Sequence, residues 1–221
     1  MRIGDFLFFS ILSISTKAQI PVSQEPYHRV VFENEDVRIL NVMLPPGDTT
    51  QYHIHSTPSV FIGLSTNRPG SQLFNQPPAQ GLFIAGSVFF EDLSAPHTRI
   101  HRVWNKDSFM FHVMDVEILK PDRVLKHPVF KTAYTRLETD TTWVRIYKTI
   151  LPKDAALTVH EADRRFLFVA LNDTKVSVSI NNKEKARFLS AGDFFWFSAG
   201  DKFTAMNRED AIATFALLEV N

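Results

Sequence analysis

The sequence contains two copies of one unit, and this repeat restricts the folds that the chain can adopt. Residues 37–64 align without a gap on residues 144–171, and eight of the 28 columns hold identical residues, including the pairs Leu44/Leu151 and His53/His160. Composition alone would give about two identities. Because 221 residues suffice for two domains of about 100 residues, we expect two related domains in tandem.

The local pattern within each copy is typical of β-strands. Short apolar runs, broken by Pro, Gly, Asn and Asp, cover residues 37–43, 59–64, 109–119, 143–151, 165–171 and 175–180. No long stretch has the 3.6-residue apolar period of a helix, so the pattern predicts an all-β fold. Residues 120–132 contain two prolines and several charges. We therefore expect domains at 19–119 and 133–221, with 120–132 as their linker.

The first eighteen residues have the layout of a secretory signal peptide. Arg2 precedes an apolar run at 6–14, and the small residues Thr16 and Ala18 follow at positions that a signal peptidase reads. The run is shorter than the roughly 20 residues that span a bilayer. We expect residues 1–18 to be removed and the protein to be exported, to the periplasm or outside the cell. A buried first strand or helix of the domain is the alternative.

Composition excludes several kinds of chemistry. The chain has no cysteine, which excludes disulfides, thiolate metal sites and a cysteine nucleophile. Lys plus Arg and Asp plus Glu each total 24, so the balanced charge argues against nucleic-acid partners and against binding to anionic lipid. The eight histidines are the only nitrogen side chains suited to a transition metal.

Two of these histidines form the strongest chemical signal. In His53-Ile54-His55 the two imidazoles alternate along a predicted strand, so they project from the same face. Two imidazoles on one face can bind one metal ion at about 2.0–2.1 Å each. Downstream, Pro96, His101 and Asn105 follow one another at fixed spacing.

Together these spacings resemble the motifs of the cupin superfamily. Gly47, His53 and His55 match the start of its first motif, G-x5-H-x-H, and Pro96, His101 and Asn105 match its second, P-x4-H-x3-N. The resemblance covers nearly all of the chain after residue 18, since the second copy also reads as a cupin unit. It implies a bicupin, remotely similar to quercetinase, with two tandem double-stranded β-helix (jelly-roll) barrels. It also implies His101 as a third metal ligand.

The departures from these motifs matter as much. The first motif expects a glutamate where Ser59 and Val60 stand. In the second copy, His160 takes the place of His53, but Ala162 and Phe203 replace the other two histidines. We therefore expect a three-histidine site in the first barrel and a degenerate, metal-free second barrel filled with apolar side chains.

Three neutral imidazoles leave a divalent ion its full charge, which favours an anionic ligand. The resemblance implies Fe(II) first, with Mn, Ni or Zn as alternatives. The sharpest hypothesis is a dioxygenase that acts on a small anionic or chelating organic molecule, and a metal-dependent isomerase or lyase fits nearly as well. The alternatives are a non-catalytic barrel that binds a ligand or metal, and a structural dimerisation module. Since exposed edge strands often pair between subunits, a homodimer is also an expectation.

Four further residues are candidates for helping the site. Gln51 shares the predicted face of His53, and Ser59 stands in the place of the missing glutamate. Glu91 is a candidate to supply the missing carboxylate from a neighbouring strand, and His112 to point into the barrel. These side chains would hydrogen-bond a bound ligand or steady a ligating histidine. His28 and His127 lie in presumed connecting segments and carry no signal.

Overall fold

The protein is built almost entirely from β-strands. A computed structural model describes residues 19–120, 124–161, 163–186 and 188–220, and the predicted signal peptide lies outside them. The described residues form nineteen strands and one short 3-10 helix, η1 (Val22–Gln24). Nothing helical in this part of the chain is long and apolar enough to cross a membrane.

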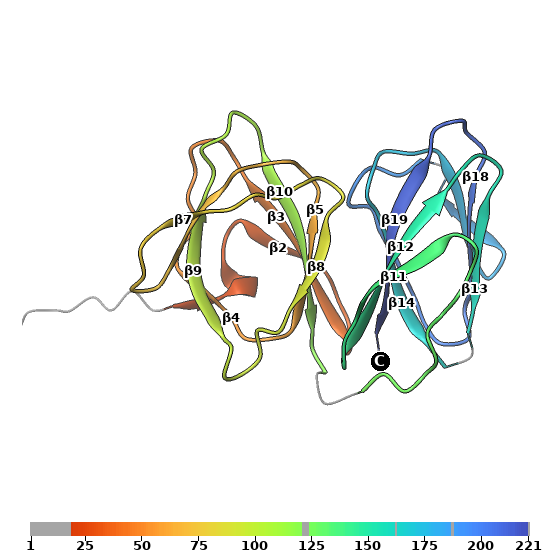
Figure 1. Ribbon diagram of the computed structural model, residues 1–221, viewed down its shortest axis with the longest axis horizontal. Helices are drawn as coiled ribbons and strands as arrows, with labels where there is room; N and C mark the ends of the chain where they lie inside the picture. The colour runs from red at the N-terminus through yellow and green to blue at the C-terminus, as the bar shows by residue number, and fades with distance from the viewer. Residues whose placement is uncertain (1–18, 121–123, 162, 187, 221) are drawn as a thin grey trace, which may run out of the picture.

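The first ten strands form two five-stranded sheets that face each other across a barrel (Figure 1). The strands are β1 (Ile20–Pro21), β2 (His28–Glu33), β3 (Val37–Leu44), β4 (His53–His55), β5 (Ser59–Gly63), β6 (Gly70–Leu73), β7 (Ala79–Gln80), β8 (Val88–Glu91), β9 (Arg99–Trp104) and β10 (Phe111–Ile118). The strand orders are β1-β4-β9-β6-β7 and β2-β3-β10-β5-β8. Strands distant in sequence are thus neighbours, as in a double-stranded β-helix.

The remaining nine strands repeat this arrangement. They are β11 (Thr135–Asp140), β12 (Val144–Leu151), β13 (Ala156–His160), β14 (Arg165–Ala170), β15 (Val176–Ile180), β16 (Lys183–Ala186), β17 (Phe194–Phe197), β18 (Lys202–Asn207) and β19 (Ala213–Val220). Their sheets have the orders β11-β12-β19-β14-β17 and β13-β18-β15-β16. The predicted fold class, two tandem all-β barrels, is confirmed. The exact domain boundaries stay a prediction.

Matching asparagines close a turn in each barrel. The side-chain amide of Asn105 donates to the carbonyl oxygens of Leu44 (2.9 Å) and Phe109 (2.7 Å). The amide of Asn207 donates to the corresponding carbonyls, those of Leu151 (2.9 Å) and Ala211 (2.8 Å). Each asparagine therefore joins a strand end to the turn that leads into β10 or β19.

The register of the strands corrects one pairing of the sequence repeat. His53 lies opposite His101 in the first barrel, whereas Val159, not His160, lies opposite Phe203 in the second. The first barrel has one additional residue between the pairing of Thr50 with β9 and that of His53. The expectation that His160 takes the place of His53 was therefore wrong, because this insertion shifts the register by one. His160 is exposed.

The two barrels share an apolar core. One face of the sheet around β10 packs against the corresponding sheet around β19, and side chains from both units form a single buried cluster (Figure 1). Its members are Val37, Ile39, Val60, Ile62, Met114, Val116 and Ile118 from the first unit, and Val144, Ile146, Leu167, Val169, Leu171, Ala216, Leu218 and Val220 from the second. Because strands such as β10 are buried on both faces, their sequences read as nearly continuous apolar runs.

Aromatic rings fill the interior of the second barrel. Phe203 is fully buried and stacks on Phe197, with ring centroids 4.5 Å apart, and Phe168 stacks on Phe215. The first barrel has a cavity in the equivalent region.

Leu218→Ala tests the shared core. Leu218 is fully buried between the barrels, so we expect the substitution to lower the free energy of unfolding by about 2–5 kcal/mol, measured by urea denaturation. Ile212→Ala is the control, because that side chain is 56% exposed and its loss should change stability by only about 0.5 kcal/mol. A loss for Leu218→Ala as small as that of the control would contradict a shared core.

Candidate metal centre

Four histidines from three strands meet inside the first barrel. His53 and His55 lie on β4, His101 lies beside His53 on β9, and His28 begins β2 in the opposite sheet. Alternation along β4 brings the first two imidazoles to the inner face, as the sequence predicted. The structure brings the three predicted ligands together and adds His28, which sequence reasoning had placed in a connecting segment.

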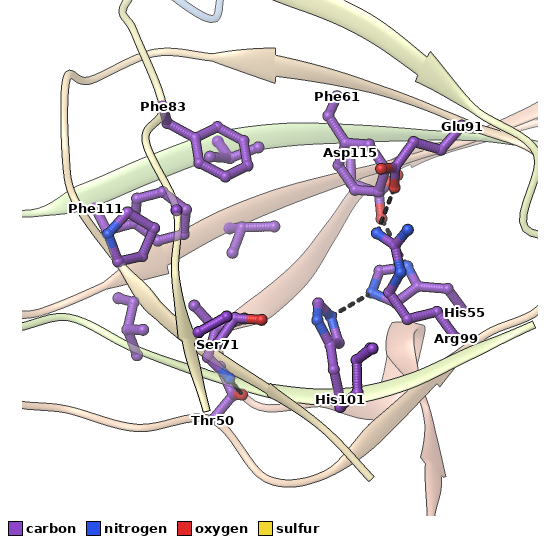
Figure 2. A pocket seen from close by; sticks show the side chains of 18 of the residues that line it. Thr50, His55, Phe61, Ser71, Phe83, Glu91, Arg99, His101, Phe111 and Asp115 are labelled. Carbon is purple, nitrogen blue, oxygen red and sulfur yellow. Dashed lines mark hydrogen bonds and ion pairs between the residues drawn. The ribbon is translucent and has the colours of Figure 1, made fainter. Parts of the chain in front are cut away.

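The ring nitrogens are close enough to share one ion. The ligand atoms of His28, His53 and His55 lie within 4.8 Å of one another. His101 joins them through Nε2, which is 3.1 Å from Nε2 of His55, and its ring centroid is 4.7 Å from that of His53 (Figure 2).

Hydrogen bonds behind two of the rings set which nitrogen faces the cluster. Nδ1 of His53 donates to the Gln51 carbonyl oxygen at 2.9 Å, and Nδ1 of His28 donates to Oε2 of Glu25 at 2.7 Å. For His53 this leaves Nε2 with its lone pair, and in both residues it is Nε2 that faces the cluster. Imidazoles that bind metals are typically held in this way, by an acceptor on the nitrogen away from the ion.

Glu25 is a buried anchor for this arrangement. Its carboxylate also accepts the backbone N–H groups of Tyr27 and Gln51. Burial alone would raise the pKa of Glu25, but the hydrogen bond and the charge of His28, with these two backbone donors, lower it overall. The carboxylate therefore stays ionised and ties β2 to the loop that precedes β4.

His53, His55 and His101 are neutral at neutral pH. Burial, reinforced by neighbouring imidazoles, lowers the pKa of His53 to about 3, that of His55 to about 3 and that of His101 to about 2. Neutral imidazoles are the form that binds a metal ion.

A carboxyl group that the sequence motifs did not reveal completes the cluster. Asp115 lies on β10 opposite Phe61, is fully buried, and has Oδ2 3.4 Å from Nδ1 of His55. Burial raises the pKa of Asp115 to about 7, and the nearby Ser59 hydroxyl partly offsets the rise. The aspartate alternates with Phe111 and Val113 along the inner face of β10, a two-residue period visible in the sequence.

The polar atoms of this cluster fit a bound cation. Among the described residues, Nε2 of His53, Nδ1 of His55 and both carboxyl oxygens of Asp115 are buried without a hydrogen-bond partner. A buried polar atom without a partner costs about 1–3 kcal/mol. Nε2 of His53 is the one of these atoms that lies where the imidazoles converge, and a metal ion bound there would give it a partner, whereas Nδ1 of His55 and the oxygens of Asp115 meet on the other side of the His55 ring.

A cavity of about 420 Å³ leads to the cluster. Its walls are mainly apolar, from Val42, Leu44, Phe61, Phe83, Phe89, Val103, Phe111 and Val113, and Figure 2 shows Phe83 and Phe111 at the end away from the histidines. Near the histidines Arg99 donates to Glu91 at 2.5 Å. The cavity therefore offers one polar end and one aromatic end.

The four predicted helper residues have different positions. Ser59 is buried beside Asp115, in the barrel interior, and donates to the Thr57 carbonyl oxygen at 3.2 Å. Gln51 acts through its backbone, as its side chain is exposed. The expectation of a side-chain contact from Gln51 was wrong because the additional residue in this segment shifts the alternation.

Glu91 stays a candidate for contact with a bound molecule, whereas the prediction for His112 was wrong. Glu91 lines the cavity, but it is paired with Arg99, and the carboxyl group beside the histidines belongs to Asp115. His112 is on the face of β10 opposite Asp115, where Nε2 contacts Oδ1 of Asn41 at 2.6 Å in a groove between the barrels. Its position on this strand differs by an odd number from those of the inward-facing Phe111, Val113 and Asp115, so its side chain lies on the other face.

The second barrel carries apolar residues at three of the matching positions. Val159 replaces His53, Phe203 replaces His101, and Leu217 replaces Asp115. The same scaffold is thus present twice in this chain, once with a polar cluster and once with an apolar core.

Comparison with known proteins supports the fold. No family model matches the sequence, and no match is found among curated protein sequences. Solved structures do match. AerE from Microcystis aeruginosa is 14% identical, with a TM-score of 0.60 over 89% of this chain and 98% of AerE. A salicylate 1,2-dioxygenase from Pseudaminobacter salicylatoxidans is 11% identical, with a TM-score of 0.62 over 90% and 77% of the two chains. YhaK from Escherichia coli is 13% identical, with a TM-score of 0.53 over 87% and 90%. The chain has the bicupin fold that these proteins share.

His101→Phe, which introduces the residue of the second barrel, tests the buried neutral imidazoles. Below the ordinary pKa of 6.5 the unfolded chain binds a proton at His101, whereas the folded chain does not until about pH 2. Stability is therefore lost as the pH falls, by up to about 2 kcal/mol for this residue between pH 6.5 and about pH 5. In chelator-treated protein, urea titrations at these two pH values should show a smaller loss for His101→Phe than for the wild type. The raised pKa of Asp115 makes its own contribution to stability rise as the pH falls. Because Asp115 is present in both proteins, that contribution cancels when the two losses are compared. Equal losses would contradict this assignment.

Proposed function

We propose that the first barrel binds one divalent transition-metal ion through its histidine cluster and uses it to act on a small anionic or chelating organic molecule. His53, His55 and His101 would be the ligands, as the sequence predicts. His28, whose ligand atom lies within 4.8 Å of those of His53 and His55, is a further candidate ligand. The observation that carries the proposal is the convergence of the histidine nitrogens, with Nε2 of His53 buried and without a hydrogen-bond partner.

The donor set favours a metal of intermediate hardness. Neutral imidazoles suit iron, nickel, zinc and copper, and the chain has no cysteine to select a softer ion. We propose Fe(II), with Mn, Ni and Zn as alternatives. Iron comes first because salicylate 1,2-dioxygenase, which has this fold and has been crystallised as an adduct with gentisate, is by its name an enzyme that uses O2, and iron is a redox-active ion that imidazole ligands suit.

The cavity would hold a ligand with one anionic end and one apolar end. The anionic end would lie toward the histidines, since their neutral rings leave the positive charge of a metal ion uncompensated. The apolar body would contact Phe61, Phe83 and Phe111, which also exclude water. An aromatic hydroxy acid or catechol has this shape and charge distribution.

We propose a dioxygenase reaction, in which both atoms of O2 enter one organic substrate and no external reductant is consumed. A bound iron ion would supply Lewis acidity toward the substrate anion and a redox partner for O2. The protein's own contribution is to hold the imidazoles in the ligating tautomer, as Glu25 and the Gln51 carbonyl do, and to orient the substrate in the apolar cavity.

Measurements of metal content test whether the ion is bound by the histidine cluster and not by other histidines of the chain. Wild-type protein loaded with Fe(II), Mn(II), Ni(II) or Zn(II) and then desalted should retain close to one ion per chain by elemental analysis. His53→Ala and His55→Ala should each lose it, because each removes a central ligand. His160→Ala, an exposed histidine of the second barrel, is the matched control and should bind like the wild type. A wild type that retains no ion under any loading condition would refute the proposal.

Oxygen consumption tests catalysis. The iron-loaded protein should consume O2 in an electrode cell with at least one of salicylate, gentisate, catechol or a flavonol, and His55→Ala should abolish the uptake. Tight metal binding without uptake for any of these substrates would instead support a non-catalytic metal- or ligand-binding barrel.

A further inference from the structure

We propose that Asp115 is a positioning residue that fixes His55 for metal binding. In this role its carboxylate accepts the Nδ1–H of His55, which leaves Nε2 of His55 free for the ion. This inference rests on the proposed metal site, and it concerns a residue outside both sequence motifs.

The argument begins with a pattern common to three rings. Nδ1 faces an oxygen acceptor in each of them: Glu25 Oε2 at 2.7 Å for His28, the Gln51 carbonyl at 2.9 Å for His53, and Asp115 Oδ2 at 3.4 Å for His55. The first two contacts are hydrogen bonds, and the third is slightly long for one. Metal coordination at Nε2 makes the N–H at Nδ1 a stronger donor, which favours closing the third contact in the same way.

The position of Asp115 relative to the ring supports positioning over direct ligation. Nε2 of His55 faces Nε2 of His101 at 3.1 Å, whereas Asp115 approaches the other nitrogen of the ring. Figure 2 shows the two side chains on different sides of His55. The carboxyl group therefore lies behind the imidazole with respect to the nitrogen that meets the cluster.

Burial of Asp115 is costly without such a role. The residue is fully buried and, within the described part of the chain, neither carboxyl oxygen accepts a hydrogen bond. At the matching place in the second barrel, Leu217 fills the position with an apolar side chain. The scaffold thus accommodates leucine at this position. The carboxyl group stands at this position only in the barrel that contains the histidines.

The test uses Asp115→Leu, which introduces the residue of the second barrel, and Asp115→Asn, which keeps an acceptor oxygen but loses the charge. We expect Asp115→Leu to weaken Zn(II) or Co(II) affinity about 10- to 100-fold in competition titrations, with Asp115→Asn in between. The melting temperature of the metal-free Asp115→Leu protein should equal or exceed that of the wild type, which shows that the weakening is not a folding defect. His112→Gln, on the other face of β10, is the control and should bind like the wild type.

Two spectroscopic measurements separate positioning from a general packing effect. Long-range ¹H–¹⁵N NMR should show the Nδ1–H tautomer of His55 in the zinc-bound wild type and its loss of order in Asp115→Leu. The visible spectrum of the Co(II) protein should indicate an unchanged coordination number in Asp115→Asn. A changed coordination number would make Asp115 a direct ligand and overturn the positioning role.

The outcomes distinguish the two proposals. If the wild type binds no metal, the proposed function fails and this inference fails with it. If the wild type binds metal and both Asp115 variants bind it as tightly as the wild type does, only the role of Asp115 is overturned.

Discussion

The apolar contact between the two barrels is the interaction on which the rest of the structure depends. It buries the outer faces of β3, β5 and β10 against β12, β14 and β19, so these strands are enclosed on both sides. Strand β10 shows the consequence: Met114 and Val116 anchor it in the shared core, while Asp115 between them is directed into the first barrel. A strand held this firmly can keep a buried carboxyl group beside a histidine at a fixed distance.

The two barrels use one scaffold for different purposes. The second is filled by phenylalanine rings and contributes apolar surface and stability. In the first barrel a cavity and a cluster of histidines occupy the place of such an aromatic core, and Nε2 of His53 and Nδ1 of His55 are buried there without hydrogen-bond partners. Such a cluster lowers the stability of the barrel that contains it. The apolar contact with the second barrel adds buried surface to the first.

Parts of the site could be read from the sequence because they depend on short-range geometry. The alternation in His53-Ile54-His55 places both rings on one face, and the spacing of His101 and Asn105 locates the neighbouring strand. His28 could not be found in this way, because it reaches the cluster from the other sheet and belongs to no spacing motif. Asp115 carried a weak signal, a charged residue that continues the inward-facing alternation of Phe111 and Val113. The assignments of Gln51 and His160 failed because one additional residue before β4 changes the register, and a gapless alignment cannot detect it.

The sequence by itself determined the all-β class, the duplication and the pairing of His53 with His55 on one face, since strand periodicity and internal repetition can be read from the chain alone, while the resemblance to cupin motifs added His101. Only the tertiary structure decided which side chains surround those histidines. Glu25 and Asp115 become partners of His28 and His55 through packing of sheets and pairing of strands far apart in sequence. It also decided that Glu91 pairs with Arg99 and that His112 faces away, because these outcomes depend on which face of a strand each barrel encloses.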